Sequence, residues 1–318
     1  MSSSIGVLIT YHNEKELLSE CLESLLAQTR LPDEVLIHDD ASDAPAEEYV
    51  PSGCPVKIMR VEVNRGPSYS RNALLKESQS DYVHFHDSDD FFHPNWCERV
   101  HQLIEESRAD VIFTEASLHR DGVISEGVLK LDQLIAGKDL IQFIIESFGY
   151  GVPIGTYRRD KVQAIGGYTE SLWYGEDLDF HTRLAQNGIS YVSIDESLVN
   201  IRHRSSSHSH RNRFRLLKGN IMAILKVADE LPARYGDDLA ERMAERAIEL
   251  YRMGYRSEGR DAIKLAHKLG RPNYNDQRHL YRFLANKLGL DMAEFLGVCY
   301  RRLIPHIVRK YIARGRLF

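Results

Sequence analysis

The sequence predicts an α/β domain followed by a helical domain, and three observations lead to this prediction. In the first third of the chain, short apolar runs alternate with helical patterns, as in a mostly parallel sheet flanked by helices. After about residue 205, helical patterns replace the strand-like runs. The charge also changes, because residues 201–318 hold 25 basic and 12 acidic side chains, which leaves 16 and 34 in residues 1–200. We therefore expect domains at 1–205 and 206–318.

The first domain is predicted to begin with a strand and an amphipathic helix. A short apolar run covers 5–10, and leucines recur at helical spacing over 16–28 before Pro32 stops the pattern. The same reasoning gives, in chain order, strands at 34–38 and 56–61, a helix at 68–78, a strand at 82–86, a helix at 94–106 with Pro94 in its first turn, and a strand at 111–114. Sheets of this kind bind ligands at the carboxyl ends of their strands.

The second domain is predicted from apolar residues at helical spacing. The patterns cover 214–231, 237–253, 257–269 and 277–288, and the stretch 205–209 is the predicted seam between the domains. No apolar run approaches the ~18 residues of a membrane span, and the first residues lack the basic start of a secretory signal. The four cysteines are scattered, which is typical of reduced thiols. We expect a cytoplasmic protein.

Three acidic clusters are the candidates for chemistry. Asp39-Asp40 follows the second predicted strand, Asp87-Ser88-Asp89-Asp90 follows the fourth, and Glu176-Asp177 opens a helical pattern. Each cluster alone is also what a turn or a helix N-terminus uses. Together they favour a hard divalent cation such as Mg²⁺ or Mn²⁺, because crowded carboxylates repel one another until a cation joins them. Such an ion usually holds a phosphate too, which indicates a nucleotide or diphosphate substrate.

Five segments then carry a resemblance over roughly residues 4–210. In order they are IGVLITYHNEKELLSECLESLLAQT, PDEVLIHDDASD, NRGPSYSRNALL, DYVHFHDSDDFFHP and IGGYTESLWYGEDLDFHTRLAQNG. This succession resembles the family 2 glycosyltransferases, which transfer sugars from nucleotide-sugars. The resemblance implies the GT-A nucleotide-diphospho-sugar transferase fold, a mostly parallel sheet flanked by helices, here followed by a C-terminal α-helical domain. The last hundred residues show no matching segment.

The resemblance also implies which residues bind the donor. Thr10, Tyr11 and Glu14 would contact the nucleoside. Asp40 would accept a hydrogen bond from a base that presents a donor, such as uracil. Arg71 would reach the ribose or the diphosphate; the other interpretation of Arg71 is a solvated helix residue. Asp87 and Ser88 would lie against the ribose and the diphosphate.

The same resemblance implies a metal site and a catalytic base. Asp89 would ligate the metal, with His203 as a second ligand, and the ion would offset charge on the departing diphosphate. In the Glu176-Asp177 pair, Asp177 would take the proton of the acceptor hydroxyl in an inverting transfer. The nearby Trp173 and Tyr174 would stack on a sugar ring or pack in the core.

We therefore predict an inverting, metal-dependent glycosyltransferase of the hexosyl or N-acetylhexosaminyl class. Its donor would be a UDP-sugar and its acceptor a glycan or a lipid-linked glycan of surface polysaccharide synthesis. One alternative is a nucleotidyl or phosphoryl transferase, although no lysine-bearing, glycine-rich phosphate loop follows the first strand. Another is a non-catalytic module that binds a sugar nucleotide or a glycan. The acidic first domain does not suit nucleic acid, and the oligomeric state stays open.

The C-terminal end carries a pattern of its own. Residues 299–318 contain six basic side chains and no acidic one, with apolar residues at helical spacing. A helix that lies in a membrane interface has this pattern, and such a helix would hold the protein at the inner face of the membrane. A final helix docked on the acidic first domain has the same pattern. Pro305 would start or kink either helix.

Overall fold

The computed structural model describes residues 2–120, 122–127, 129–148, 152–204, 212–274 and 279–303. The chain divides into two compact units, Met1–Val227 and Ala228–Phe318, so the division falls inside the last turn of helix α9 (Arg213–Glu230). The sequence placed the domain boundary at 205/206 instead. Most of α9 belongs to the first unit because its side chains pack there, as when Lys226 pairs with the buried Asp179 at 2.7 Å.

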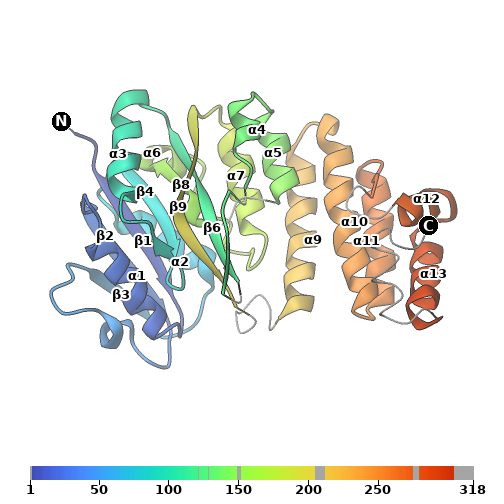
Figure 1. The fold of residues 1–318 in the computed structure, drawn as a ribbon, viewed down its shortest axis with the longest axis horizontal. Helices are drawn as coiled ribbons and strands as arrows, with labels where there is room; N and C mark the ends of the chain where they lie inside the picture. Colours follow the sequence, from blue (N-terminus) through green and yellow to red (C-terminus); the bar gives the residue numbers. More distant parts are fainter. Residues whose placement is uncertain are drawn as a thin grey trace. The chain divides into compact units, whose positions relative to one another are not determined.

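The first unit is built around one mixed sheet of nine strands (Figure 1). Its strands are β1 (Ile5–Tyr11), β2 (Glu34–Asp40), β3 (Lys57–Val61), β4 (Tyr82–Asp87), β5 (Phe91–Phe92), β6 (Val111–Arg120), β7 (Val123–Ser125), β8 (Gly155–Arg158) and β9 (Tyr191–His203). They lie in the order β3-β2-β1-β4-β8-β6-β9-β5, with β7 paired to β6. The first four strands are parallel, whereas β8 runs antiparallel to both β4 and β6.

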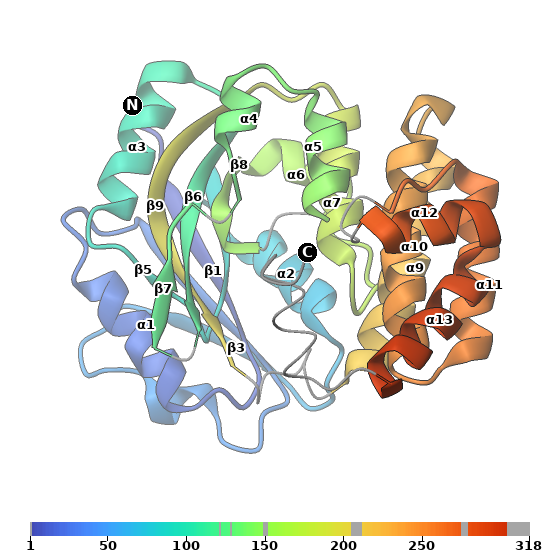
Figure 2. The same cartoon turned by 45° about the vertical axis from the view of Figure 1, so that its right-hand side comes forward.

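Helices cover both faces of this sheet. They are α1 (Glu16–Leu26), α2 (Pro67–Glu77), α3 (Trp96–Ser107), α4 (Asp132–Ile135), α5 (Leu140–Ser147), α6 (Arg159–Ala164) and α7 (Glu176–Gln186), with short 3₁₀ turns at Ala46–Tyr49 and Val152–Ile154. Figure 2 shows α1 and α3 on one face and α2, α6 and α7 on the other. The predicted fold class, a GT-A-like α/β sheet followed by helices, is confirmed.

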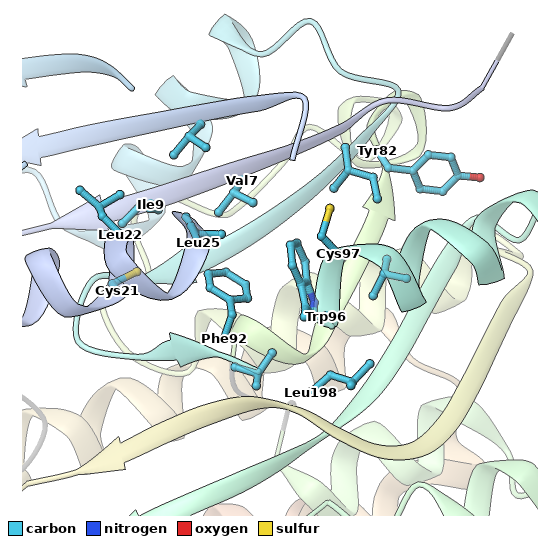
Figure 3. Packing of buried hydrophobic residues seen from close by; sticks show 14 of the residues in the cluster. Val7, Ile9, Cys21, Leu22, Leu25, Tyr82, Phe92, Trp96, Cys97 and Leu198 are labelled. Atoms are coloured by element: carbon cyan, nitrogen blue, oxygen red, sulfur yellow. The ribbon is translucent and has the colours of Figure 1, made fainter. Parts of the chain in front are cut away.

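The core between the sheet and the α1–α3 face is tightly filled with apolar side chains. Leu22 and Leu25 of α1 point toward Val7 and Ile9 of β1, while Trp96 at the start of α3 is fully buried (Figure 3). The helix predicted at 94–106 begins at Trp96 in the structure, two residues later than predicted. Pro94 lies in the preceding turn, which is closed by a hydrogen bond from the Trp96 N–H to the His93 carbonyl.

The register of the parallel strands brings the acidic clusters to one edge. Thr10 on β1 lies opposite His38 on β2 and opposite Asp87 on β4. The carboxyl ends of the three strands are thus level, as the sequence predicted. Asp40, the last residue of β2, and Asp89, which follows β4, line the same cavity.

The second unit consists of helices. It contains a 3₁₀ turn at Ala233–Tyr235 followed by α10 (Gly236–Arg252), α11 (Arg256–Leu269), α12 (His279–Leu288) and α13 (Leu290–Leu303). The main contact is between α10 and α11, and glycines allow it: a Cβ on Gly259 would lie 2.7 Å from the ring of Tyr251. Within the described residues, no helix has the length and apolar character needed to cross a membrane. The predicted basic end lies mostly in 304–318, outside the described residues.

Candidate active site

A cavity of about 510 Å³ opens at the carboxyl ends of β1, β2 and β4. Ten of the eleven predicted site residues line it: Thr10, Tyr11, Glu14, Asp40, Arg71, Asp87, Ser88, Asp89, Glu176 and Asp177. Among the described residues, the eleventh, His203, is not part of the lining. The structure therefore brings together residues from five segments that the sequence places up to 167 positions apart, from Thr10 to Asp177.

Arg71 is the central charged group of the cavity. It rises from α2, its side chain is 3% exposed, and it joins two acidic clusters. Nη2 donates to Asp87 Oδ1 at 3.1 Å, and Nη1 donates to Glu176 Oε1 at 2.9 Å. Asp177 Oδ1 lies 4.0 Å from the same guanidinium. The interpretation of Arg71 as a solvated helix residue was therefore wrong, because a buried guanidinium requires several acceptors and these carboxylates supply them.

Asp177 has the environment of a proton acceptor. Its side chain is 21% exposed, and its Oδ1 has no hydrogen-bond partner among the described residues. Burial and the neighbouring charge of Glu176 raise the pKa of Asp177 well above its usual range, and Arg71 opposes this shift. Asp177 lines the cavity, and a carboxylate with a raised pKa in such a place is suited to accept a proton from a bound hydroxyl.

Asp40 holds the loop that forms one wall of the cavity. Its Oδ1 accepts from the Arg65 N–H and its Oδ2 from the Gly66 N–H, each at 2.8 Å. The neighbouring Asp39 is fully buried and accepts from the backbone of Ser42 at 2.9 Å, so it is part of the fold. A carboxylate oxygen can accept a second hydrogen bond, so the structure adds an anchoring role to the base contact predicted for Asp40.

A cation that the sequence analysis did not single out contacts the predicted metal ligand, Asp89. Arg204 follows the end of β9, and its Nη2 donates to Asp89 Oδ2 at 2.6 Å and to Glu14 Oε2 at 2.8 Å. Burial and the charge of Asp87 raise the pKa of Asp89 to about 6, against the effect of Arg204. The carboxylates of Glu14, Asp87 and Asp89 therefore lie in one corner of the cavity, close to the guanidinium of Arg204.

The donor atoms of this corner fit a hard divalent cation that is also held by a diphosphate. Asp87 and Asp89 supply carboxylate oxygens at the cavity surface, and one or two such groups are the usual protein share for Mg²⁺ with a nucleotide. Among the described residues, no group of three or more acidic, His or Cys side chains is arranged to hold an ion by itself. His203 as a ligand stays a prediction.

Several cavity residues were missed by sequence reasoning. Asn220 of α9 lines the cavity although it lies in the chain's helical part. It comes close to the start of α7, because a Cβ on Gly175 would lie 3.2 Å from Asn220 Oδ1 and 2.8 Å from the Cβ of Ala223. His12 accompanies Asp40, with its Nδ1 2.8 Å from the Asp40 carbonyl oxygen. Asn220 belongs to a helix that was predicted from the spacing of its apolar residues. Such spacing indicates which face of a helix is buried, but it does not indicate which element that face packs against.

Comparisons with known proteins show which family the chain resembles. Glycosyl transferase family 2 matches residues 6–151. An uncharacterized glycosyltransferase from Haemophilus influenzae is 30% identical over 185 residues, which make up 57% of this chain and 62% of its own length. YwdF, an uncharacterized glycosyltransferase of Bacillus subtilis, is 30% identical over 58% of this chain and 68% of its own. The amylovoran biosynthesis glycosyltransferase AmsE of Erwinia amylovora is 26% identical over 68% and 82%.

A solved structure shares the fold. The S. aureus TarS fragment 1–349 in complex with UDP-GlcNAc superposes with a TM-score of 0.63 at 19% identity, over 94% of this chain and 92% of that one. At this identity the likeness concerns the fold. The match includes the cavity-bearing sheet and extends into the helical C-terminal part.

Proposed function

The chain belongs to glycosyl transferase family 2, and we propose that it is an inverting, metal-dependent glycosyltransferase acting in surface polysaccharide synthesis. The main support for this proposal is a set of ion pairs made by the Arg71 guanidinium. It pairs with Asp87 at the end of β4 and with Glu176 and Asp177 at the start of α7. A diphosphate-binding corner and a proton-accepting carboxylate thereby belong to a single cavity. An inverting transfer needs both groups, on opposite sides of the reacting carbon.

The donor is proposed to be a UDP-sugar. The TarS structure named above holds UDP-GlcNAc, and its fold matches this chain along nearly its whole length. In this chain Asp40 faces the cavity beside Tyr11, whose buried hydroxyl donates to the Ala44 carbonyl oxygen at 3.0 Å. A carboxylate accepts hydrogen bonds and does not donate them, so it favours a base with an N–H at its edge, as uracil has.

The acceptor side is organised around Asp177. The acceptor hydroxyl oxygen forms the new bond to the anomeric carbon, and its proton passes to the Asp177 carboxylate. The bond from that carbon to the diphosphate oxygen breaks with its electron pair on the diphosphate, so the configuration inverts. Arg71 stabilises the ionised form of Asp177, and Glu176 keeps the guanidinium in place through its 2.9 Å hydrogen bond.

Charge on the departing diphosphate is balanced in the corner of Asp87 and Asp89. A divalent metal bound there supplies Lewis-acid stabilisation of the diphosphate oxygens. Thr10 and Arg71 hold Asp87 in position, because both donate to its Oδ1 at 3.1 Å. Asp87 therefore presents its second oxygen to the cavity.

The acceptor is proposed to be a glycan or a lipid-linked glycan. AmsE, whose name assigns it to amylovoran biosynthesis, is similar to this chain over 82% of its length. A lipid-linked acceptor would place the protein at the cytoplasmic face of a membrane, where the basic residues of 299–318 meet anionic lipid.

A donor screen tests the proposed function. The purified protein is incubated with Mn²⁺ or Mg²⁺ and a panel of UDP-, GDP- and dTDP-sugars, and the released nucleoside diphosphate is measured. We expect release from UDP-sugars, its loss with EDTA, and its loss in Asp177→Asn. Release of UDP that is unaffected by EDTA would contradict metal dependence, and the absence of release from every donor, with a mixed glycan acceptor present, would contradict the activity.

A further inference from the structure

An exposed indole ring lies at the cavity beside the proposed base. Trp173 is 45% exposed, lines the cavity and precedes Glu176 and Asp177 in the turn that leads into α7. The chain has two tryptophans, and the other, Trp96, is fully buried in the core. An apolar ring of this size exposed at a functional cavity calls for a ligand that covers it.

The ring is supported from beneath by a bare stretch of backbone. A Cβ on Gly66 would lie 3.0 Å from Cε2 and 3.1 Å from Cδ2 of Trp173. These two carbons join the two rings of the indole and carry no hydrogen, so contact with both requires an approach to the flat face. Gly66 thus lies against one face of the indole, and a side chain at this position would collide with the ring.

Gly66 is itself fixed in place. Its φ of +88° is a conformation that favours glycine, and its N–H donates to the buried carboxylate of Asp40 at 2.8 Å. The indole therefore rests on a backbone segment that cannot easily move away. This support orients the Trp173 ring before any ligand arrives, which lowers the ordering cost of binding.

We propose that Trp173 is the platform on which the sugar ring of the acceptor stacks. This inference rests on the proposed function and names the class of its acceptor: a pyranose with an axial-hydrogen face, such as a β-linked glucose, galactose or N-acetylglucosamine unit. The C–H groups of that face carry a small positive charge and are attracted by the negative face of the indole. One edge of a ring lying there can face the Glu176–Asp177 end of the cavity, where a hydroxyl on that edge can give its proton to Asp177.

A binding experiment that does not depend on turnover tests the platform. Because Trp96 is buried, a change in tryptophan emission on adding sugar reports on Trp173. The protein, saturated with UDP and Mn²⁺, is titrated with cellobiose, chitobiose and methyl β-galactoside, with sorbitol as a control that lacks a ring. We expect a saturable change with at least one of the ring sugars and none with sorbitol. If all three leave the emission unchanged, or sorbitol matches them, the proposal is overturned.

Kinetics with an active sugar acceptor then separate the platform from the base. Trp173→Ala should raise the acceptor KM roughly five- to tenfold, the range of one aromatic stacking contact, with the UDP dissociation constant within about twofold of wild type. Trp173→Tyr keeps a ring and should recover most of the loss. Tyr255→Ala removes an exposed aromatic ring outside the cavity lining and should change neither value. A rise in the UDP dissociation constant equal to the rise in acceptor KM would assign Trp173 to the donor and overturn the proposal.

The two proposals fail in different ways. If no nucleotide-sugar is turned over, the proposed function fails, and the emission titration still decides whether Trp173 binds a pyranose. If the donor is turned over and the emission titration shows no binding, the function stands and the platform is wrong.

Discussion

Arg71 Nη1 lies 2.9 Å from Glu176 Oε1, and this ion pair joins two parts of the chain separated by 105 residues. The guanidinium is 3% exposed and the glutamate 11%, so water screens the pair little. Through its other nitrogen the same guanidinium holds Asp87. A displacement of Arg71 would therefore disturb both Asp87, at the proposed diphosphate site, and Asp177, the proposed base.

Replacing Arg71 should cost both stability and catalysis. Arg71→Ala leaves the carboxylates of Asp87, Glu176 and Asp177 without their shared cation. We expect a loss of about 3 kcal/mol in the free energy of unfolding, the low end for a broken buried ion pair, because the Asp87 side chain is 37% exposed. Urea titration measures it. Arg271→Ala, an exposed arginine just after α11, is the control, and equal losses in the two variants would contradict the central role of Arg71.

Removing the charge of Asp177 should affect turnover and leave donor binding nearly intact. Asp177→Asn keeps the shape of the side chain and cannot take the proton. We expect kcat to fall by at least about 100-fold while the UDP dissociation constant stays within a few-fold of wild type. Steady-state kinetics and calorimetry give the two values. If donor affinity and kcat decline together, Asp177 belongs to the donor site and another group is the base.

The same substitution should stabilise the protein at neutral pH. The folded-state pKa of Asp177 is raised, mainly by burial, so folding favours the protonated carboxyl. Below the ordinary carboxyl pKa of about 4 both states are protonated, and stability is lost as the pH rises through the raised pKa of the folded state. Asn imitates the protonated form throughout. We therefore expect Asp177→Asn to have a higher Tm than wild type at pH 7, and the difference to shrink toward pH 4.

The exposed carboxylate of Asp229 provides the control for this pH series. Asp229→Asn changes the net charge by the same amount at a site without a cavity role, so its Tm difference from wild type should be small and nearly independent of pH. A Tm gain for Asp177→Asn that stays constant between pH 4 and pH 7 would show that the gain has another origin.

Sequence reasoning predicted the parallel half of the sheet well and its antiparallel half poorly. The strands at 5–10, 34–38 and 82–86 are rich in apolar residues, because neighbouring strands and helices bury both of their faces. The strand β8 is four residues long, GTYR, and carries no apolar run. Its pairing with β4 and β6 is a long-range choice that local residue patterns do not encode.

The residues of the candidate site were likewise predicted only in part. The acidic clusters follow predicted strands, so parallel register was enough to place Asp40, Asp87 and Asp89 at one edge. Arg204 was missed because the adjacent His203 is the more familiar metal ligand. Which of two neighbouring side chains at the end of a strand reaches the acidic residues depends on the direction of the backbone there. The contacts of Asn220 likewise depend on how α9 packs, which apolar spacing does not determine.

The pairing of Arg204 with Asp89 predicts a competition with the metal. Asp89→Ala should abolish the Mn²⁺-dependent part of UDP binding if Asp89 is the ligand. Arg204→Gln removes a positive charge 2.6 Å from that carboxylate, so Mn²⁺ alone should bind several-fold more tightly than to wild type. Calorimetry measures both. Lys264→Gln on α11 removes an exposed charge outside the cavity lining and should leave both affinities unchanged. Unaltered Mn²⁺ affinity in Arg204→Gln would contradict the competition.

The helical C-terminal part should bring the protein to anionic membranes. Exposed apolar side chains recur at helical spacing on α12, at Leu280 and Phe283, and on α13, at Met292 and Phe295. The chain from 279 to 318 holds eight Lys and Arg against two acidic residues. Apolar insertion together with about 1 kcal/mol per basic residue near an anionic surface gives stable binding. We expect the full chain to sediment with phosphatidylserine vesicles at low salt and to be released at high salt.

Two variants separate the contributions to this binding. A chain that ends at Leu303 keeps α13 and lacks four basic residues, so its binding to the vesicles should weaken. Phe283→Asp and Phe295→Asp replace exposed side chains and should weaken insertion without loss of fold. If the full chain remains in the supernatant with anionic vesicles at low salt, membrane association is refuted. A concentration-dependent rise in molar mass by light scattering would then identify the apolar face as a contact between copies of the chain.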